Sequence, residues 1–247
     1  LMIRQYKISV PKNTLNNIYK KVKKYPWKMI QKVNGWEYGT NYKFLKKISQ
    51  YWISKYDWKK FENKINSFKN YKTNVDGINI HFIKEKSKNP KSRPLLLLHG
   101  WPGSVIEFFD IIPRLAHPEK FGGKIEDGFD VIVPSLPGFG FSTPIKKALG
   151  PRKIGRVLNK FMVKNLGHKN YIVQGGDWGA TIAAWIGLDS AKYCKGIHIN
   201  CLPIRHPKGP KNIKEKKWEK KFNFDQIMQE GYRTQQATKP QTLSYAM

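Results

Sequence analysis

The residues best suited to chemistry lie between Tyr171 and Ala180, where an apolar stretch runs into Gly-x-Asp-x-Gly, with Asp177 at its centre. This is the spacing of the sharp strand-to-helix turn Gly-x-Ser-x-Gly, which exposes a nucleophile, with aspartate in place of serine. Small neighbours are needed because the turn leaves no room for side chains. A carboxylate is ionised near neutral pH, so it needs no activating base and can displace a leaving group from a saturated carbon, forming an alkyl ester. The alternative is a glycine-rich turn in which Asp177 caps the following helix. The apolar strand before it favours the nucleophile.

A second chemical segment is the loop His99–Ser104, which follows the apolar run Pro94–Leu98. In enzymes with such a turn, one backbone N–H of the oxyanion hole comes from a loop of this kind, and the other from the residue after the nucleophile. These positions are Trp101 and Trp178. His99 precedes the nucleophile, whereas the general base of such enzymes follows it, so we assign His99 a structural role.

Apolar periodicity indicates the elements that must position these residues. In the first 70 residues, spacings of three and four predict three helices: one that begins near Pro11, one over residues 41–56 and one over residues 58–68. From Lys72 onward, strands are expected at residues 78–82, 94–98, 129–133, 171–174 and 196–200, and helices at residues 105–115, 152–166 and 178–189. Strands that alternate with helices predict an α/β fold with a mainly parallel sheet covered on both faces. The basic stretch 205–221 is predicted to be a solvated insertion or linker.

Composition excludes several classes of protein. The 247 residues carry 46 Lys and Arg against 17 Asp and Glu, a net charge of +29. Only seven of the basic residues are Arg, and they are scattered, so a nucleic-acid-binding role is not favoured. Two cysteines exclude a disulfide scaffold and a four-cysteine zinc site. Apolar residues make up 40% of the chain, but no apolar run approaches the ~20 residues that span a bilayer.

Further motifs follow one another along nearly all of the chain. Together they resemble the microsomal-type epoxide hydrolases, including the insect juvenile hormone epoxide hydrolases, and the first four are similar to an N-terminal module that other α/β-hydrolases lack. The motifs are Tyr6–Ile8, Trp36–Gly39, Tyr51–Trp58, Gly77–Ile83, His99–Ser104, Pro134–Ser142, Gly175–Gly179, and Gly231-Tyr232 with Thr238–Pro240.

This resemblance implies an α/β-hydrolase fold and a two-step hydrolysis that needs no metal or organic cofactor. Asp177 would attack an epoxide carbon while lid tyrosines, Tyr232 among them, hydrogen-bond to the ring oxygen and supply its proton. Trp178 is also expected to bind substrate. A His–acid pair would then activate water to release a vicinal diol. The substrate would be a small, apolar epoxide, either a xenobiotic or juvenile hormone.

The resemblance also implies parts that follow Tyr232 in the family: a second lid tyrosine, the charge-relay acid, the catalytic His and the last strands of the sheet. Relatives carry a membrane anchor upstream. Because a sheet without its final strands exposes an open edge, we expect the 247-residue piece to fold poorly alone. With Asp177 but no catalytic His, a folded piece is expected to react once and stall as the ester.

By the same resemblance, residues 1–90 are expected to form the helical N-terminal module with the first strands, residues 91–204 the hydrolase core, and residues 205–247 the start of the lid. The expected location is the cytosolic face of the endoplasmic reticulum membrane, reached only through the upstream anchor. The oligomeric state is left open.

Two other functions compete with epoxide hydrolysis. A haloalkane dehalogenase would use the same aspartate and hold the leaving halide with Trp178. Release of halide, rather than of a diol, would distinguish it from an epoxide hydrolase. A non-catalytic hormone- or lipid-binding protein would keep the pocket, and its binding would be reversible and unchanged by Asp177→Ala.

Overall fold

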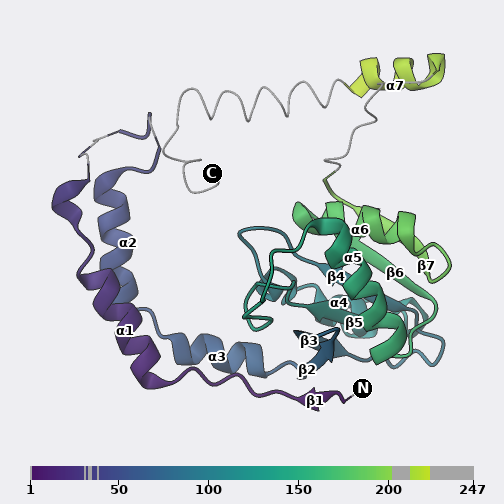
Figure 1. Ribbon diagram of the computed structural model, residues 1–247, viewed down its shortest axis with the longest axis horizontal. Helices are drawn as coiled ribbons and strands as arrows, with labels where there is room; N and C mark the ends of the chain where they lie inside the picture. The colour runs from purple at the N-terminus through teal and green to yellow at the C-terminus, as the bar shows by residue number, and fades with distance from the viewer. Residues whose placement is uncertain (1, 31, 33–34, 38, 202–211, 223–247) are drawn as a thin grey trace. The chain divides into compact units, whose positions relative to one another are not determined.

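The computed structural model describes residues 2–30, 32, 35–37, 39–201 and 212–222 (Figure 1). The chain divides into two compact units. The first comprises residues 1–8 and 60–205, and it contains the sheet together with Trp101, Asp177 and Trp178. The second comprises residues 9–59 and 206–247, and its described part is helical. The predicted boundaries at residues 90 and 204 stay predictions.

The first unit is built on a seven-stranded mixed sheet with the order β1-β2-β3-β5-β4-β6-β7. Its strands are β1 (Arg4–Gln5), β2 (Asn70–Val75), β3 (Ile78–Glu85), β4 (Pro94–Leu98), β5 (Asp130–Pro134), β6 (Tyr171–Gly175) and β7 (Cys194–Ile199). Strands β5, β4, β6 and β7 are parallel neighbours, whereas β1, β2 and β3 are joined to them and to one another in antiparallel pairs. The predicted α/β-hydrolase sheet is thereby confirmed.

Both faces of the sheet are covered. Leu96 and Leu98 of β4 pack in a core with α5 (Pro151–Lys160) and α6 (Trp178–Asp189), which lie side by side on one face (Figure 1). Leu95 and Leu97 are equally buried but point to the opposite face, which α4 (Ile112–Ala116) helps to cover. Because a central strand buries both of its faces, its sequence is a continuous apolar run.

Some expected elements differ in detail. The helix expected over residues 105–115 is a 3-10 turn, η2 (Val105–Phe108), followed by the separate short helix α4. Pro113 lies in the first turn of α4, where its missing N–H is tolerated, but it could not continue a longer helix. The helix expected over 152–166 is α5 followed by a π-helical turn, η5 (Phe161–Asn165). Sequence reasoning missed β1, which consists of two polar residues, and β2, in which Asn and Lys interrupt the apolar pattern.

The 3-10 turns η3 (Pro118–Phe121) and η4 (Ile125–Asp127) complete the connections of the first unit. In the second unit, α1 (Lys12–Lys23) packs beside α2 (Tyr42–Ser54), and η1 (Trp27–Met29) lies between them in sequence. Helix α3 (Trp58–Asn66) continues into the first unit. The helices occur where they were predicted, but their apolar stripes are not a closed core: no residue of α1 or α2 is fully buried. The stripes line a groove of about 430 Å³, formed by Leu15, Ile18, Tyr19, Ile48, Tyr51, Trp52, Tyr56 and Trp58.

The basic stretch expected to be a linker contains a helix, α7 (Ile213–Phe222). Asn212 caps it: its Oδ1 accepts the Glu215 N–H at 2.9 Å, and its Nδ2 donates to Glu215 Oε1 at 3.0 Å. The spacing Asn-x-x-Glu is a helix-start signal, but the many basic residues around it led to the prediction of a linker. The remainder of the stretch lies outside the described residues.

A buried polar network joins the antiparallel strands to the loop after β5. Asn70 donates both amide hydrogens to backbone carbonyls, so its Oδ1 must accept from His81 Nε2–H, at 2.9 Å. The other ring nitrogen of His81 lies 2.9 Å from Ser135 Oγ, and Ser142 Oγ accepts the His81 backbone N–H. His81 is fully buried and neutral in this network. Burial, and to a lesser degree the charge of Lys72, lowers its pKa to about 3.

This network predicts a specific acid sensitivity. The pKa of His81 is lower in the folded state than in the unfolded chain, so protons bind preferentially to the unfolded chain below pH 6.5. The stabilisation is therefore complete above pH 6.5 and is lost as the pH falls toward about 3, at ~1.4 kcal/mol per pH unit. Urea unfolding between pH 7 and pH 4.5 should show a slope that is shallower by this amount in His81→Gln than in the wild type. Equal slopes would contradict the prediction.

Candidate functional site

Asp177 lies in the sharp turn between β6 and α6, as the glycine spacing predicted. Its backbone has φ +50° and ψ −125°, a positive φ that residues with a side chain rarely adopt. Asp177 is the N-terminal flanking residue of α6, but its side chain caps no N–H of that helix. The helix-capping alternative therefore does not describe this carboxylate. The strain instead resembles that stored at functional sites, where it costs about 1–3 kcal/mol per residue.

The two flanking glycines are required by backbone contacts. A Cβ on Gly175 would lie 2.2 Å from the carbonyl oxygen of Gly179, and a Cβ on Gly179 would lie 2.2 Å from the carbonyl oxygen of Leu98. Strand β4 therefore presses directly against the first turn of α6. This close approach brings the residues that follow β4 alongside Asp177.

The loop after β4 contacts the carboxylate itself. Leu98 and Gly175 are paired in the parallel ladder, so the segments that follow β4 and β6 leave the sheet side by side at its carboxyl edge. There the backbone N–H of Trp101 donates to Asp177 Oδ1 at 2.8 Å. Gly100 makes this possible, because a Cβ at that position would lie 2.5 Å from Asp177 Cβ. Oδ1 is thus fixed by the loop.

His99 holds the start of this loop. Its Nδ1–H donates to the Gly100 carbonyl at 2.9 Å, and its Nε2 accepts the N–H of Leu136 at 3.0 Å, which ties the loop to the segment after β5. Both bonds require the neutral ring, and burial lowers the pKa of His99 accordingly. With both nitrogens engaged, His99 has the structural role expected of it.

Glu107 is a carboxylate of this region that the sequence reasoning did not single out. It lies in η2, where its Oε1 accepts the backbone N–H of Ser104 at 3.2 Å, while Ser104 Oγ accepts the N–H of Ile106 at 3.4 Å. This is a reciprocal cap, and the spacing Ser-x-x-Glu was its available signal.

Of the other predicted site residues, the structure describes Trp178 but not Tyr232. Trp178 is the first residue of α6, so its N–H has no partner within the helix, and its side chain is 48% exposed. Tyr232 lies outside the described residues, as does most of the expected lid. The structure therefore brings together Asp177, Trp101 and Trp178, and their catalytic roles stay proposals.

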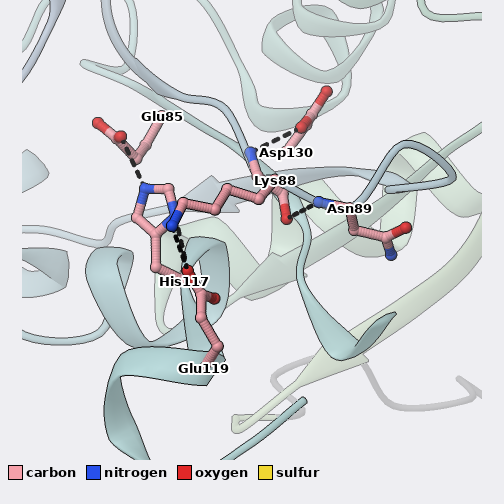
Figure 2. Close-up of polar contacts among 7 residues, drawn as sticks. Glu85, Lys88, Asn89, His117, Glu119 and Asp130 are labelled. Carbon is pink, nitrogen blue, oxygen red and sulfur yellow. Dashed lines mark hydrogen bonds and ion pairs between the residues drawn. The ribbon is translucent and has the colours of Figure 1, made fainter. Parts of the chain in front are cut away.

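A second polar cluster lies elsewhere in the first unit (Figure 2). His117 Nε2 lies 3.0 Å from Glu85 Oε1, and Lys88 Nζ lies 3.5 Å from Glu119 Oε1. The pKa of Glu119 is lowered by hydrogen bonding and by the charges of Lys88 and His117, against the effect of desolvation. Among the described residues, neither this cluster nor any other group of three or more His, Cys, Asp and Glu side chains is arranged to hold a metal ion.

Comparison with known proteins defines the class. A family model described as "alpha/beta hydrolase fold" matches residues 93–246, and one described as "Epoxide hydrolase N terminus" matches residues 3–108. The chain belongs to the alpha/beta hydrolase fold family, and its N-terminal part matches the N-terminal module of epoxide hydrolases. The predicted resemblance is confirmed.

Individual relatives agree with this assignment. The chain is 34% identical over 270 residues to epoxide hydrolase 1 of Oryctolagus cuniculus, covering 99% of this chain and 59% of the relative. It is 32% identical over 269 residues to juvenile hormone epoxide hydrolase 1 of Ctenocephalides felis, covering 100% and 57%. The crystal structure of juvenile hormone epoxide hydrolase from Bombyx mori matches with a TM-score of 0.72 and 35% identity, covering 81% of this chain and 53% of that one.

The chain thus spans less than two thirds of the length of these relatives. The helices of its described part include none that is long and apolar enough to cross a membrane.

Proposed function

We propose that the whole protein hydrolyses small-molecule epoxides to vicinal diols through an alkyl ester on Asp177. The observation that carries the proposal is the hydrogen bond from the Trp101 N–H to Asp177 Oδ1 at the strained turn. This bond gives the two carboxylate oxygens different roles: Oδ1 is held by the loop, and Oδ2 is the oxygen that attacks the substrate.

In the first step, Asp177 Oδ2 attacks an epoxide carbon. A carbon–oxygen bond forms, the ring carbon–oxygen bond breaks, and the ring oxygen leaves as an alkoxide. An aliphatic alkoxide is a poor leaving group, so it must receive a proton as the ring opens. We assign that donation to the hydroxyl of Tyr232. The Asp177 carboxylate loses its charge as it becomes an ester.

In the second step, water gives a proton to the His–acid pair that the family resemblance implies and attacks the carbonyl carbon of the ester, so negative charge develops on Oδ1. This oxygen already lies 2.8 Å from the Trp101 N–H, which is the distance at which an oxyanion donor is effective. The N–H of Trp178, free of helical partners, is the second donor. Collapse of the intermediate breaks the bond between the carbonyl carbon and Oδ2, which receives the proton taken from water and leaves as a hydroxyl of the diol.

Oxygen labelling tests this order of bonds. In a single turnover of styrene oxide in ¹⁸O-water, we expect an unlabelled diol, because its new oxygen comes from Asp177. The peptide containing Asp177 should instead gain one heavy oxygen, measured by mass spectrometry. A labelled diol in the first turnover would show direct attack by water and would refute the ester. Release of halide from a chloroalkane, with no diol from styrene oxide, would favour a dehalogenase.

We propose an apolar epoxide as the substrate, either a xenobiotic or a juvenile hormone, because the relatives include both epoxide hydrolase 1 and juvenile hormone epoxide hydrolases. We propose further that the protein works at the cytosolic face of the endoplasmic reticulum membrane. Diol formation from styrene oxide and from juvenile hormone, assayed separately in microsomal and cytosolic fractions, tests both statements.

A further inference from the structure

The loop that carries the Trp101 N–H is held at both ends. His99 fixes its start through the two bonds described above. Glu107 fixes its end by accepting the Ser104 N–H, and between them the Gly103 N–H donates to the Gly100 carbonyl at 3.0 Å. The loop segment that carries this N–H is therefore fixed at one end by the buried imidazole of His99 and at the other by the carboxylate of Glu107.

Glu107 lies closer to the loop than an ordinary helix cap requires. A Cβ on Gly103 would lie 1.7 Å from Glu107 Oε1, so the carboxylate occupies the space of the missing side chain. The two carboxylates also influence each other: desolvation raises the pKa of Glu107 and the charge of Asp177 raises it further, whereas the backbone N–H groups of Ser104 and Gly100 lower it. Both carboxylates, Glu107 and Asp177, thus accept hydrogen bonds from the same short loop.

We propose that Glu107 is a positioning residue for the second step of the reaction: by fixing the loop from Gly100 to Ser104, it keeps the Trp101 N–H on Asp177 Oδ1. This inference rests on the proposed ester mechanism. It assigns Glu107 no contact with substrate.

The two steps differ in how strongly they need this N–H. In the first step Oδ1 loses negative charge, so its hydrogen bond to Trp101 weakens and does not lower the barrier. In the second step the charge returns to Oδ1, and a donor already in place lowers the barrier. A loosened loop therefore slows hydrolysis of the ester more than its formation, and the ester accumulates.

Rapid-quench mass spectrometry of the protein reacting with styrene oxide tests this inference. In Glu107→Ala we expect ester hydrolysis to slow by about 10- to 100-fold, less than the ~10²- to 10³-fold loss of an entire oxyanion donor. Ester formation should stay close to the wild-type rate, so most of the protein is alkylated at steady state. Glu107→Gln retains an oxygen that can accept the Ser104 N–H, and it should restore most of the hydrolysis rate.

Two further variants separate positioning from general damage. Gly103→Ala leaves Glu107 in the chain but displaces its carboxylate, and it should accumulate ester as Glu107→Ala does. Glu126→Ala removes a carboxylate from another 3-10 turn, η4, before β5 and far along the chain from the loop, and should behave as wild type. Equal slowing of both steps, or unchanged partitioning in Glu107→Ala, would overturn the inference. Absence of ester in the wild type would instead overturn the proposed function, and this inference with it.

Discussion

Asp177→Ala is expected to abolish the covalent ester and to lower kcat by on the order of 10⁶-fold, the loss measured when a hydrolase loses its nucleophile. The reason is that the reaction forms its covalent bond on the Asp177 carboxylate, which the turn presents to the Trp101 N–H. Asp177→Gly removes the same carboxylate and should be equally inactive. Diol formation from styrene oxide, followed together with the mass of the intact protein, measures both losses.

The two variants should differ in stability, and in an unusual direction. In the middle of a helix or strand, glycine makes a protein less stable than alanine does by roughly 0.5–1 kcal/mol, because glycine loses more conformational freedom on folding. At φ +50°, however, alanine retains a strain of about 1–3 kcal/mol that glycine does not have. We therefore expect Asp177→Gly to unfold at higher urea concentration than Asp177→Ala. The reverse order would show that the turn is relaxed, and it would remove the argument that strain presents the nucleophile.

Gly100→Ala is expected to have the second largest effect, although it removes no functional group. The new Cβ would lie 2.5 Å from Asp177 Cβ and 2.6 Å from its Oδ1. Rotation of the Asp177 side chain cannot relieve a contact with Cβ, so the loop and the turn must move apart. Misplacement of a reacting group by about 1 Å costs on the order of 10²-fold in rate, and we expect at least this loss in kcat/KM for styrene oxide.

A matched control is available within the same sheet. A Cβ on Gly196 of β7 would meet Ile172 at 3.8 Å, an ordinary contact, so Gly196→Ala should retain the wild-type kcat/KM. If Gly100→Ala were as active as Gly196→Ala, the close approach of the loop to Asp177 would have no part in the reaction. Circular dichroism of both variants separates a local displacement from loss of the fold.

Features whose causes are local were predictable from the sequence. The turn at Asp177 follows from the glycines beside it, because their lack of side chains is needed wherever such a turn is made. The strands β4, β5 and β6 follow from short apolar runs, the helices α1 and α2 from periodicity and start signals, and α6 from its place after the nucleophile turn. The α/β-hydrolase class and the epoxide hydrolase module followed from the order of these motifs along the chain.

Tertiary structure alone decided which of these residues meet. The bond from the Trp101 N–H to Asp177 Oδ1 joins groups 76 positions apart, and it depends on the parallel pairing of β4 with β6. Strand β2 forms because β3 offers it a pairing edge, and β1 forms in turn on β2; their polar sequences do not by themselves favour strands. Glu107 reads as a helix cap in the sequence, and only its approach to Gly103 reveals its place beside the site. Local patterns are governed by a residue's own neighbours, whereas distances between carboxylates and amides are set by how the sheet packs.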